Sequence, residues 1–142
     1  NQLGLYVVMY SPLQMAADLP KNYMRFPDAF QFIKDVALDW DKSIYLEAEP
    51  GEYVTIARKE KGTDNWFVGN SNGYDKREAL VDFKFLDKNR KYTATIYRDS
   101  KDADYAKNPQ SYKIEKIEVS SKSKIKIPTV AAGGFAISIL PN

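Results

Sequence analysis

The residues of this sequence that could do chemistry are mainly carboxylates, and one group of them is tightly clustered. Asp99, Asp102 and Asp104 lie in one stretch and could offer oxygen ligands to calcium. An EF-hand loop places its acids at alternate positions, follows them with glycine and ends on glutamate at position twelve. This stretch lacks the glycine, and its twelfth position is Gln110. We therefore interpret the aspartates as an acidic turn and predict no metal ligand among them.

A second group of carboxylates, Glu47, Glu49 and Glu52, flanks the turn Pro50-Gly51. Glycoside hydrolysis uses two carboxyl groups on either side of the scissile bond. Glu47 and Glu49 fall on one face of a strand that ends in a hairpin tip, which is typical of a solvated face. Acids at such a tip lack the burial that separates the pKa values of a catalytic pair. We expect no catalytic residue here.

Five lysines form a basic stretch that begins next to Tyr112. A nucleic-acid groove combines such charge with exposed aromatic side chains. Glu115 and Glu118 interrupt the stretch, and isoleucines alternate with several of the lysines, which indicates solvent-facing strand positions. The net charge of +2 gives no support to a nucleic-acid or membrane partner, and we predict neither. The lysines are Lys113, Lys116, Lys122, Lys124 and Lys126.

Four aromatic residues, Trp40, Trp66, Tyr53 and Tyr74, could stack on sugar rings, as in carbohydrate-binding modules. Aromatic residues in sandwich cores are commoner, so we favour core packing for Trp66.

The composition restricts the remaining chemistry. The chain has 142 residues, enough for one domain with a sizeable core, and it contains no cysteine and no histidine. Disulfides, thiolate nucleophiles, histidine metal sites and Ser-His-Asp catalysis are thereby excluded. The apolar stretch from Leu3 to Leu19 is interrupted by polar residues and prolines, so we expect a core element and no membrane span. The start of the chain carries no signal peptide, and we interpret the sequence as part of a longer protein.

Two regions differ in their pattern. In residues 1–42, Gln2–Tyr10 has helical spacing, residues 12–17 are typical of a buried strand, and Pro27 begins a second helix. From residue 43 to 142 the chain reads as strands separated by turn residues. The predicted strands are Ile44–Glu49, Glu52–Glu60, Asn65–Asn70, Ala79–Leu86, Lys91–Asp99, Tyr112–Ser120, Lys124–Ile127 and Phe135–Leu140.

Strict alternation of apolar and polar residues predicts which side of these strands is buried. The pattern favours a two-layer antiparallel β-sandwich. The residues expected inside are Val81, Phe83, Phe85, Tyr92, Ile96, Ile125, Ile137 and Ile139.

Several long runs, in the same order along the chain, resemble glycoside hydrolase family 97. They are Leu5–Pro20, Ala29–Val36 with Asp39-Trp40, Gly51–Lys59, Tyr92–Tyr97 and Asp102–Tyr105. The resemblance covers nearly the whole chain and is weakest from Asn70 to Arg77. Members of this family have an N-terminal β-domain, a central (β/α)8 barrel and a C-terminal β-sandwich. The resemblance implies that 1–42 is the last helix–strand–helix of the barrel and 43–142 is the sandwich.

The family hydrolyses α-glucosidic or α-galactosidic bonds, with calcium near the substrate. Its catalytic acids and calcium ligands belong to barrel segments that would precede Asn1, so the resemblance implies no catalytic, metal or cofactor residue in this chain. Asp18 would end the final barrel strand, at the face where barrel active sites lie, although a loop or cap acid is the simpler interpretation. The resemblance also implies a periplasmic or extracellular location for the longer protein.

Two functions follow as hypotheses. In the first, the chain is a non-catalytic structural module of an exo-acting α-glucosidase or α-galactosidase, whose partners are the barrel, the N-terminal β-domain and an α-linked oligosaccharide. In the second, it is a carbohydrate-binding sandwich. The lead-in, residues 1–27, carries many apolar side chains that the barrel would cover. In the isolated chain it has three alternatives, to fold back over the sandwich, to lose order or to pair with another copy, and we favour self-association.

Overall fold

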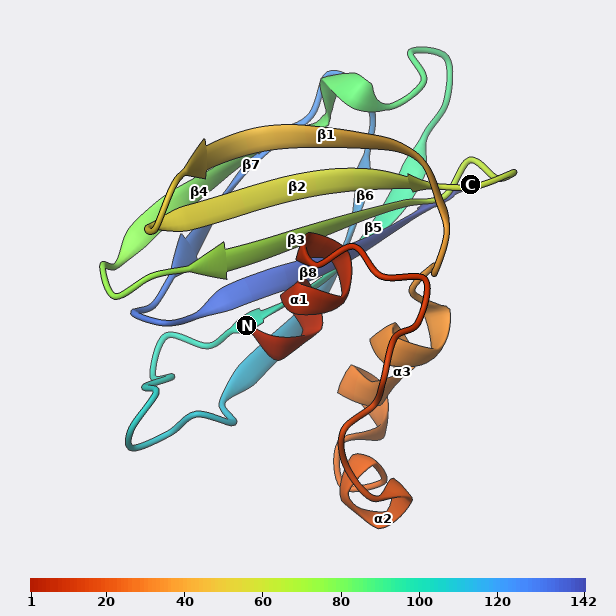
Figure 1. The fold of residues 1–142 in the computed structure, drawn as a ribbon. Coiled ribbons are helices and arrows are strands. Elements are labelled where there is room, and N and C mark those ends of the chain that lie inside the picture. Colours follow the sequence, from red (N-terminus) through yellow and green to blue (C-terminus); the bar gives the residue numbers. More distant parts are fainter.

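The computed structural model describes all of residues 1–142, and most of its regular structure is β-strand (Figure 1). Three helices come first: α1 (Gln2–Val8), α2 (Pro20–Tyr23) and α3 (Pro27–Asp35). No helix is long and apolar enough to cross a membrane. The strands are β1 (Trp40–Glu49), β2 (Tyr53–Glu60), β3 (Trp66–Asn72), β4 (Arg77–Asp82), β5 (Tyr92–Asp99), β6 (Tyr112–Val119), β7 (Lys124–Thr129) and β8 (Gly134–Pro141).

The strands form two antiparallel sheets of unequal size. Six strands make the larger sheet, in the order β1-β2-β3-β8-β5-β6, and β4 and β7 make the smaller one. Every strand pair is antiparallel, which confirms the mainly-β antiparallel prediction. The two edge strands of the larger sheet differ. The register of β1 shifts between Trp40 and Lys42 and again between Tyr45 and Glu47, whereas β6 pairs with β5 without a shift.

The main hydrophobic core lies between the two sheets. It contains six of the eight side chains predicted to be inside, and all six are buried; Phe85 and Ile125 are only partly buried. The predicted strand through Leu86 ends early, because Phe83–Phe85 forms a short 3-10 helix. Asp82 begins that turn by accepting a hydrogen bond from the backbone N–H of Lys84. Phe83 is nevertheless fully buried.

A second core lies on the opposite face of the larger sheet, under the helices. Val7 of α1 and Phe32 of α3 are fully buried there with Phe67, and the rings of Phe32 and Phe67 meet edge to face at 6.1 Å. Figure 1 shows α1 lying across β3 and β8. Of the alternatives for the lead-in, α1 therefore takes the one in which it folds back over the sandwich, since its apolar face packs on the chain's own sheet.

Glycine makes this contact close. A Cβ atom on Gly4 of α1 would lie 2.7 Å from the carbonyl oxygen of Phe135, and closer still to that of Asn70. Gly69 of β3 meets the backbone of Gly4 in the same way. Backbone therefore rests directly on backbone, which only residues without a side chain permit.

The predicted strand at residues 12–17 is wrong for this chain. The segment is irregular and exposed, and no strand pairs with it. A strand buried on both faces needs neighbours that hydrogen-bond to its backbone. The strand β1 begins at Trp40, shortly before the proposed boundary at residue 43, so the division into 1–42 and 43–142 stays a prediction.

Candidate functional site

The three aspartates of the β5–β6 loop have separate structural roles. Asp99 accepts a hydrogen bond from the backbone N–H of Gly134 at 2.7 Å. Asp104 accepts bonds from the backbone N–H groups two and three residues further on, both at 2.9 Å. The hydroxyl of Ser100 donates to Asp102 and lowers the pKa of that carboxyl. No group of three acidic side chains converges in this chain as metal ligands would.

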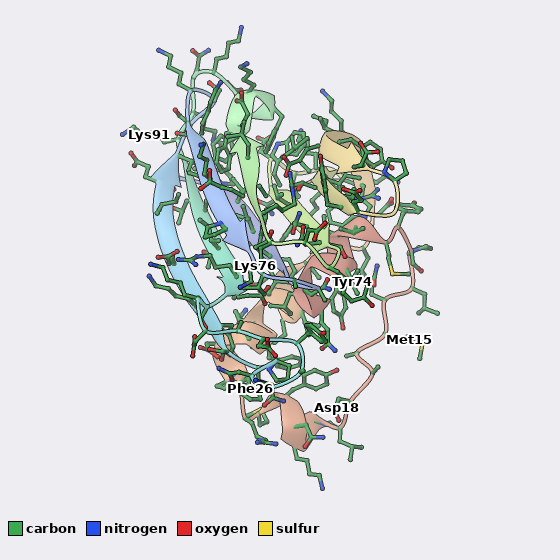
Figure 2. The ribbon with its side chains drawn as sticks, turned by 90° about the vertical axis from the view of Figure 1, so that its left-hand side faces the viewer. Met15, Asp18, Phe26, Tyr74, Lys76 and Lys91 are labelled. Carbon is green, nitrogen blue, oxygen red and sulfur yellow. The ribbon has the colours of Figure 1, made fainter.

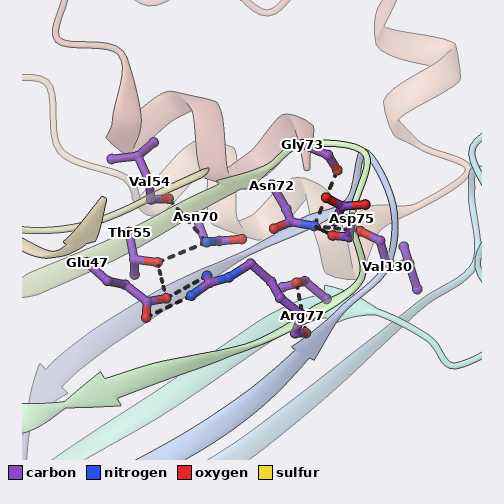
Figure 3. Close-up of polar contacts among 10 residues, drawn as sticks. Glu47, Val54, Thr55, Asn70, Asn72, Gly73, Asp75, Arg77 and Val130 are labelled. Atoms are coloured by element: carbon purple, nitrogen blue, oxygen red, sulfur yellow. Dashed lines mark hydrogen bonds and ion pairs between the residues drawn. The ribbon is translucent and has the colours of Figure 1, made fainter. Parts of the chain in front are cut away.

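Of the three glutamates around the β1–β2 hairpin, Glu47 differs from the prediction (Figure 3 shows Glu47 with Arg77). Glu49 and Glu52 are exposed, as expected, but Glu47 is mostly buried and forms a two-pronged ion pair with Arg77 of β4 at 2.8 and 3.0 Å. The guanidinium of Arg77 also lies 3.5 Å from the ring centroid of Tyr53, and its hydrogen bonds to Glu47 raise the pKa of Arg77. The pair joins the edges of the two sheets, which a solvated glutamate could not do.

The lysines and tryptophans lie largely where the sequence placed them. Lys113, Lys124 and Lys126 are exposed and pair with neighbouring acids at 2.6 to 3.2 Å. Exposed pairs of this kind contribute little stability. Trp66 is buried with its ring 4.7 Å from that of Phe85, which confirms core packing.

Arg58 is the main residue that the sequence analysis missed. It lies on β2 and is only 7% exposed, yet no acidic side chain pairs with it. Its guanidinium donates to the carbonyl oxygens of Val7 at 2.7 Å and Val8 at 3.3 Å, and to the hydroxyl of Ser43 at 2.8 Å. Burial lowers the pKa of Arg58.

The negative end of α1 takes the place of a carboxylate for Arg58, because the last carbonyl groups of a helix have no partner within it. Arg58 thus attaches the lead-in to the sheet. No local pattern marks it, since its partners on α1 lie about fifty residues away in the sequence.

Beyond α1 the lead-in leaves the sheet. Leu13 and Met15 are 73% and 74% exposed, and Met9, Leu19 and Met24 are exposed as well. Figure 2 shows Met15 pointing away from the rest of the molecule. Exposed apolar side chains in such number are typical of a surface that contacts other protein.

Asp18 lies at the end of this exposed segment, two residues before α2 begins at Pro20. Its carboxylate accepts hydrogen bonds from the backbone N–H of Leu19 at 2.7 Å and from the side chain of Asn22 at 2.6 Å, and the bond from Asn22 lowers the pKa of Asp18 most. This is the geometry of a loop acid. A place at a barrel mouth stays a prediction, since the surrounding barrel is no part of these 142 residues.

A groove of about 710 Å³ separates α2 and α3 from the loops at one end of the sheet. Phe26, Phe30, Tyr105 and Tyr112 contribute aromatic rings to it. The hydroxyl of Tyr112 donates to Asp28 across the groove at 2.7 Å, so the helices are joined to β6.

Tyr105 lines this groove, and its ring contacts that of Tyr74 from the neighbouring β3–β4 loop. Tyr74, in the β3–β4 loop, is 82% exposed, and Tyr105, in the β5–β6 loop, is 62% exposed. Their rings are nearly perpendicular, with centroids 6.5 Å apart. Figure 2 places Tyr74 beside Lys76 on the surface. Neither ring belongs to a core, whereas Trp66 and Trp40 pack in or against the two cores and Arg77 covers the ring of Tyr53. The sugar-stacking alternative therefore retains Tyr74 and gains Tyr105.

Comparison with known protein families decides the assignment. A family model described as "Glycosyl-hydrolase 97 C-terminal, oligomerisation" matches residues 39–140. The chain belongs to this family. The resemblance noted in the sequence is thereby confirmed. The description of the family associates this domain with oligomerisation.

Two curated relatives extend the match beyond the family model. The chain is 40% identical to a retaining α-galactosidase of Bacteroides thetaiotaomicron over 98% of its own length and 20% of that protein's. It is 27% identical to a probable retaining α-galactosidase of Streptomyces bingchenggensis over 96% of its length, again 20% of the relative. The chain therefore spans about a fifth of the length of these relatives.

Solved structures agree with this assignment. A glycoside hydrolase family 97 enzyme from Pseudoalteromonas sp. strain K8, solved in complex with acarbose, superposes with a TM-score of 0.97 at 42% identity. The match covers 99% of this chain and 22% of that one. A β-arabinopyranosidase shares the fold at a TM-score of 0.75 and 24% identity.

Proposed function

We propose that this chain is the non-catalytic C-terminal module of an exo-acting α-glycoside hydrolase, an α-galactosidase or α-glucosidase that degrades oligosaccharides. The observation that supports this most is the 40% identity to a retaining α-galactosidase over nearly the whole chain. The carboxylates of the chain fit the non-catalytic part of the proposal. They are engaged in turns, in ion pairs or on open surface, and none forms a pair that faces across a pocket.

The lead-in is the part of the module that would join the barrel. Its helix α1 is fixed by Arg58, while the segment from Met9 to Leu19 is irregular and exposes several apolar side chains. In the longer protein this segment would enter the barrel as a strand, with Asp18 at its mouth. The catalytic acids and the calcium ligands would come from the preceding barrel, and the protein would be periplasmic or extracellular.

A chimera tests this role. Residues 1–142 replace the matching fifth of the Bacteroides thetaiotaomicron α-galactosidase, and hydrolysis of p-nitrophenyl α-galactoside is measured. We expect a folded chimera that keeps most of the α-galactosidase activity, because the contacts of the lead-in with the barrel would be preserved. The chain alone should not hydrolyse the substrate.

Asp18→Asn in the chimera tests the barrel-mouth position, with Asp28→Asn as the matched control on α3. We expect the first change to lower kcat and the second to leave it unchanged. A chimera that folds without activity, or turnover by the isolated chain, would contradict the proposed function. Equal kcat values for the two variants would remove only the role of Asp18.

A further inference from the structure

We propose that Tyr74 and Tyr105 form a binding site for a pyranose ring of an α-linked oligosaccharide. The choice of α-linked sugars rests on the proposed function. The site itself rests on the two exposed rings and their surroundings.

The two rings form the sides of a right-angled cradle. They come from different loops, their planes are 75° apart and their centroids are 6.5 Å apart. A pyranose has an apolar face of C–H groups and a rim of hydroxyls. One tyrosine ring can cover the apolar face while the other contacts the edge of the sugar. Neither phenol hydroxyl is engaged elsewhere in the chain, so both can exchange hydrogen bonds with sugar hydroxyls.

The loop that carries Tyr74 is fixed in place. The side-chain amide of Asn72 donates to the carbonyl oxygens of Asp75 at 2.7 Å and Val130 at 3.0 Å (Figure 3). The backbone N–H of Gly73 donates to Glu52 at 2.6 Å. The backbone on either side of Tyr74 is therefore fixed, and the loop loses little conformational entropy when Tyr74 binds a ligand.

The loop that carries Tyr105 is fixed as well. Asp104 accepts hydrogen bonds from the two backbone N–H groups that follow Tyr105, and it forms an isolated β-bridge with Asn108. Both rings are therefore solvent-exposed and carried by loops whose backbone is fixed by hydrogen bonds. They are typical of binding surfaces, where rigid aromatic side chains supply much of the contact.

The charges around the cradle favour a neutral ligand. In the sequence, Asp75 and Lys76 follow Tyr74, and Asp104 and Lys107 lie within two residues of Tyr105, so each loop carries one acid and one base close to its tyrosine. The charges balance, which gives no net attraction for an anion or a cation. They do offer hydrogen-bond acceptors and donors on both sides, which is what a polyhydroxylated neutral ring requires.

The test is an NMR titration of the 142-residue chain with maltotriose and with raffinose, and with cellotriose as the β-linked control. We expect saturable shifts of the backbone amides around Tyr74 and Tyr105 with at least one α-linked sugar. Tyr74→Ala and Tyr105→Ala should each weaken binding about tenfold, the effect of losing ~1.4 kcal/mol. Tyr74→Phe should keep most of the affinity, and Tyr45→Ala, an exposed tyrosine on β1, should change nothing.

Three results would overturn the proposal: no saturable shift in the two loops, equal binding of cellotriose, or equal loss of affinity with Tyr45→Ala. Loss of self-association in a Tyr74→Ala/Tyr105→Ala chain, without any sugar response, would assign the rings to a protein contact and would also overturn it. The proposed function is tested separately. Hydrolysis of p-nitrophenyl α-galactoside by the chimera should not change when Tyr74 is replaced by Ala.

Discussion

At the scale of single residues, the hydrogen bond between Tyr112 and Asp28 joins the helices to the edge strand β6. It also alters both groups. The bond from Tyr112 lowers the pKa of Asp28. Burial, with a further contribution from the hydrogen bond to Asp28, raises the pKa of Tyr112 to about 12. Shifts in these directions mean that the bond stabilises the fold only while the phenol is protonated and the carboxyl is ionised.

We predict that the hydroxyl of Tyr112 contributes to the free energy of unfolding only within a limited pH range. This contribution should be fully present above the ordinary aspartate pKa of about 3.9 and be lost as the pH falls through the lowered value. It should be fully present below the ordinary tyrosine pKa of about 10 and be lost as the pH rises through about 12. Urea unfolding of the wild-type chain and of Tyr112→Phe, compared across pH, measures it.

Tyr74→Phe is the matched control for this comparison, since the hydroxyl of Tyr74 has no partner. The difference between wild type and Tyr112→Phe should be constant near neutral pH and shrink at both extremes. A difference that is the same at every pH would contradict the hydrogen bond.

Single residues also show how far sequence reasoning reaches. The burial of Trp66 and the exposure of the strand lysines follow from residue type and alternation, which are local properties. Glu47 and Arg58 could not be placed in this way. Their exposure depends on Arg77 and on the end of α1, which are far away in the sequence. A charged residue inside a strand is expected to be exposed to solvent. Only knowledge of a partner far away in the sequence would predict that it is buried.

At the scale of elements, the close contact of α1 with β3 and β8 depends on Gly4. In an isolated helix alanine is more favourable than glycine by about 1 kcal/mol. We expect the opposite here, because a methyl group on Gly4 would collide with the backbone of Asn70 and Phe135. Gly4→Ala should destabilise the chain by about 1–3 kcal/mol, as measured by chemical denaturation.

Gln2→Ala, an exposed change in the same helix, is the control and should be neutral or slightly stabilising. If Gly4→Ala stabilised the chain as much as Gln2→Ala, α1 would not rest on the sheet as described.

The elements themselves were largely predictable. All eight strands and the helices at the start of the chain and at Pro27 follow from periodicity and turn residues. The segment at residues 12–17 differs because its apolar side chains predict burial, while a strand also needs partners. The unequal sizes of the two sheets were not predictable either, since alternation indicates a buried face without indicating which strands pair.

At the scale of the whole molecule, the exposed lead-in predicts self-association of the isolated chain. Burying one large apolar side chain contributes roughly 1.5–3 kcal/mol. Leu13→Ser combined with Met15→Ser should therefore weaken association about a hundredfold or more. Light scattering should show a dimer or larger species of the wild-type chain at micromolar concentration and mainly monomer for the double variant. Removing residues 1–27 would be a poorer test, because α1 covers part of the second core.

Leu80→Ser, an exposed leucine on β4, is the matched control and should leave association unchanged. A wild-type chain that remains monomeric at these concentrations would contradict self-association through the lead-in.

The unshifted edge strand β6 limits the symmetry of any such assembly. A two-fold axis perpendicular to the sheet would join two copies of β6 as antiparallel neighbours. Side chains on one face of the first copy then lie on the same face of the second. Because paired residues point to the same side of a sheet, the central residue of β6 must lie opposite its own copy. In β6 that residue is Glu115 or Lys116, and like charges directly opposite are destabilising. A different register would pair Lys113 with Glu118 and Ile114 with Ile117. In that register the second copy presents its opposite face upward. The two copies are then related by a screw axis, which does not close and produces a filament. A closed dimer that pairs the full length of β6 is therefore disfavoured, and we expect a closed dimer of this chain to meet through side-chain surfaces instead.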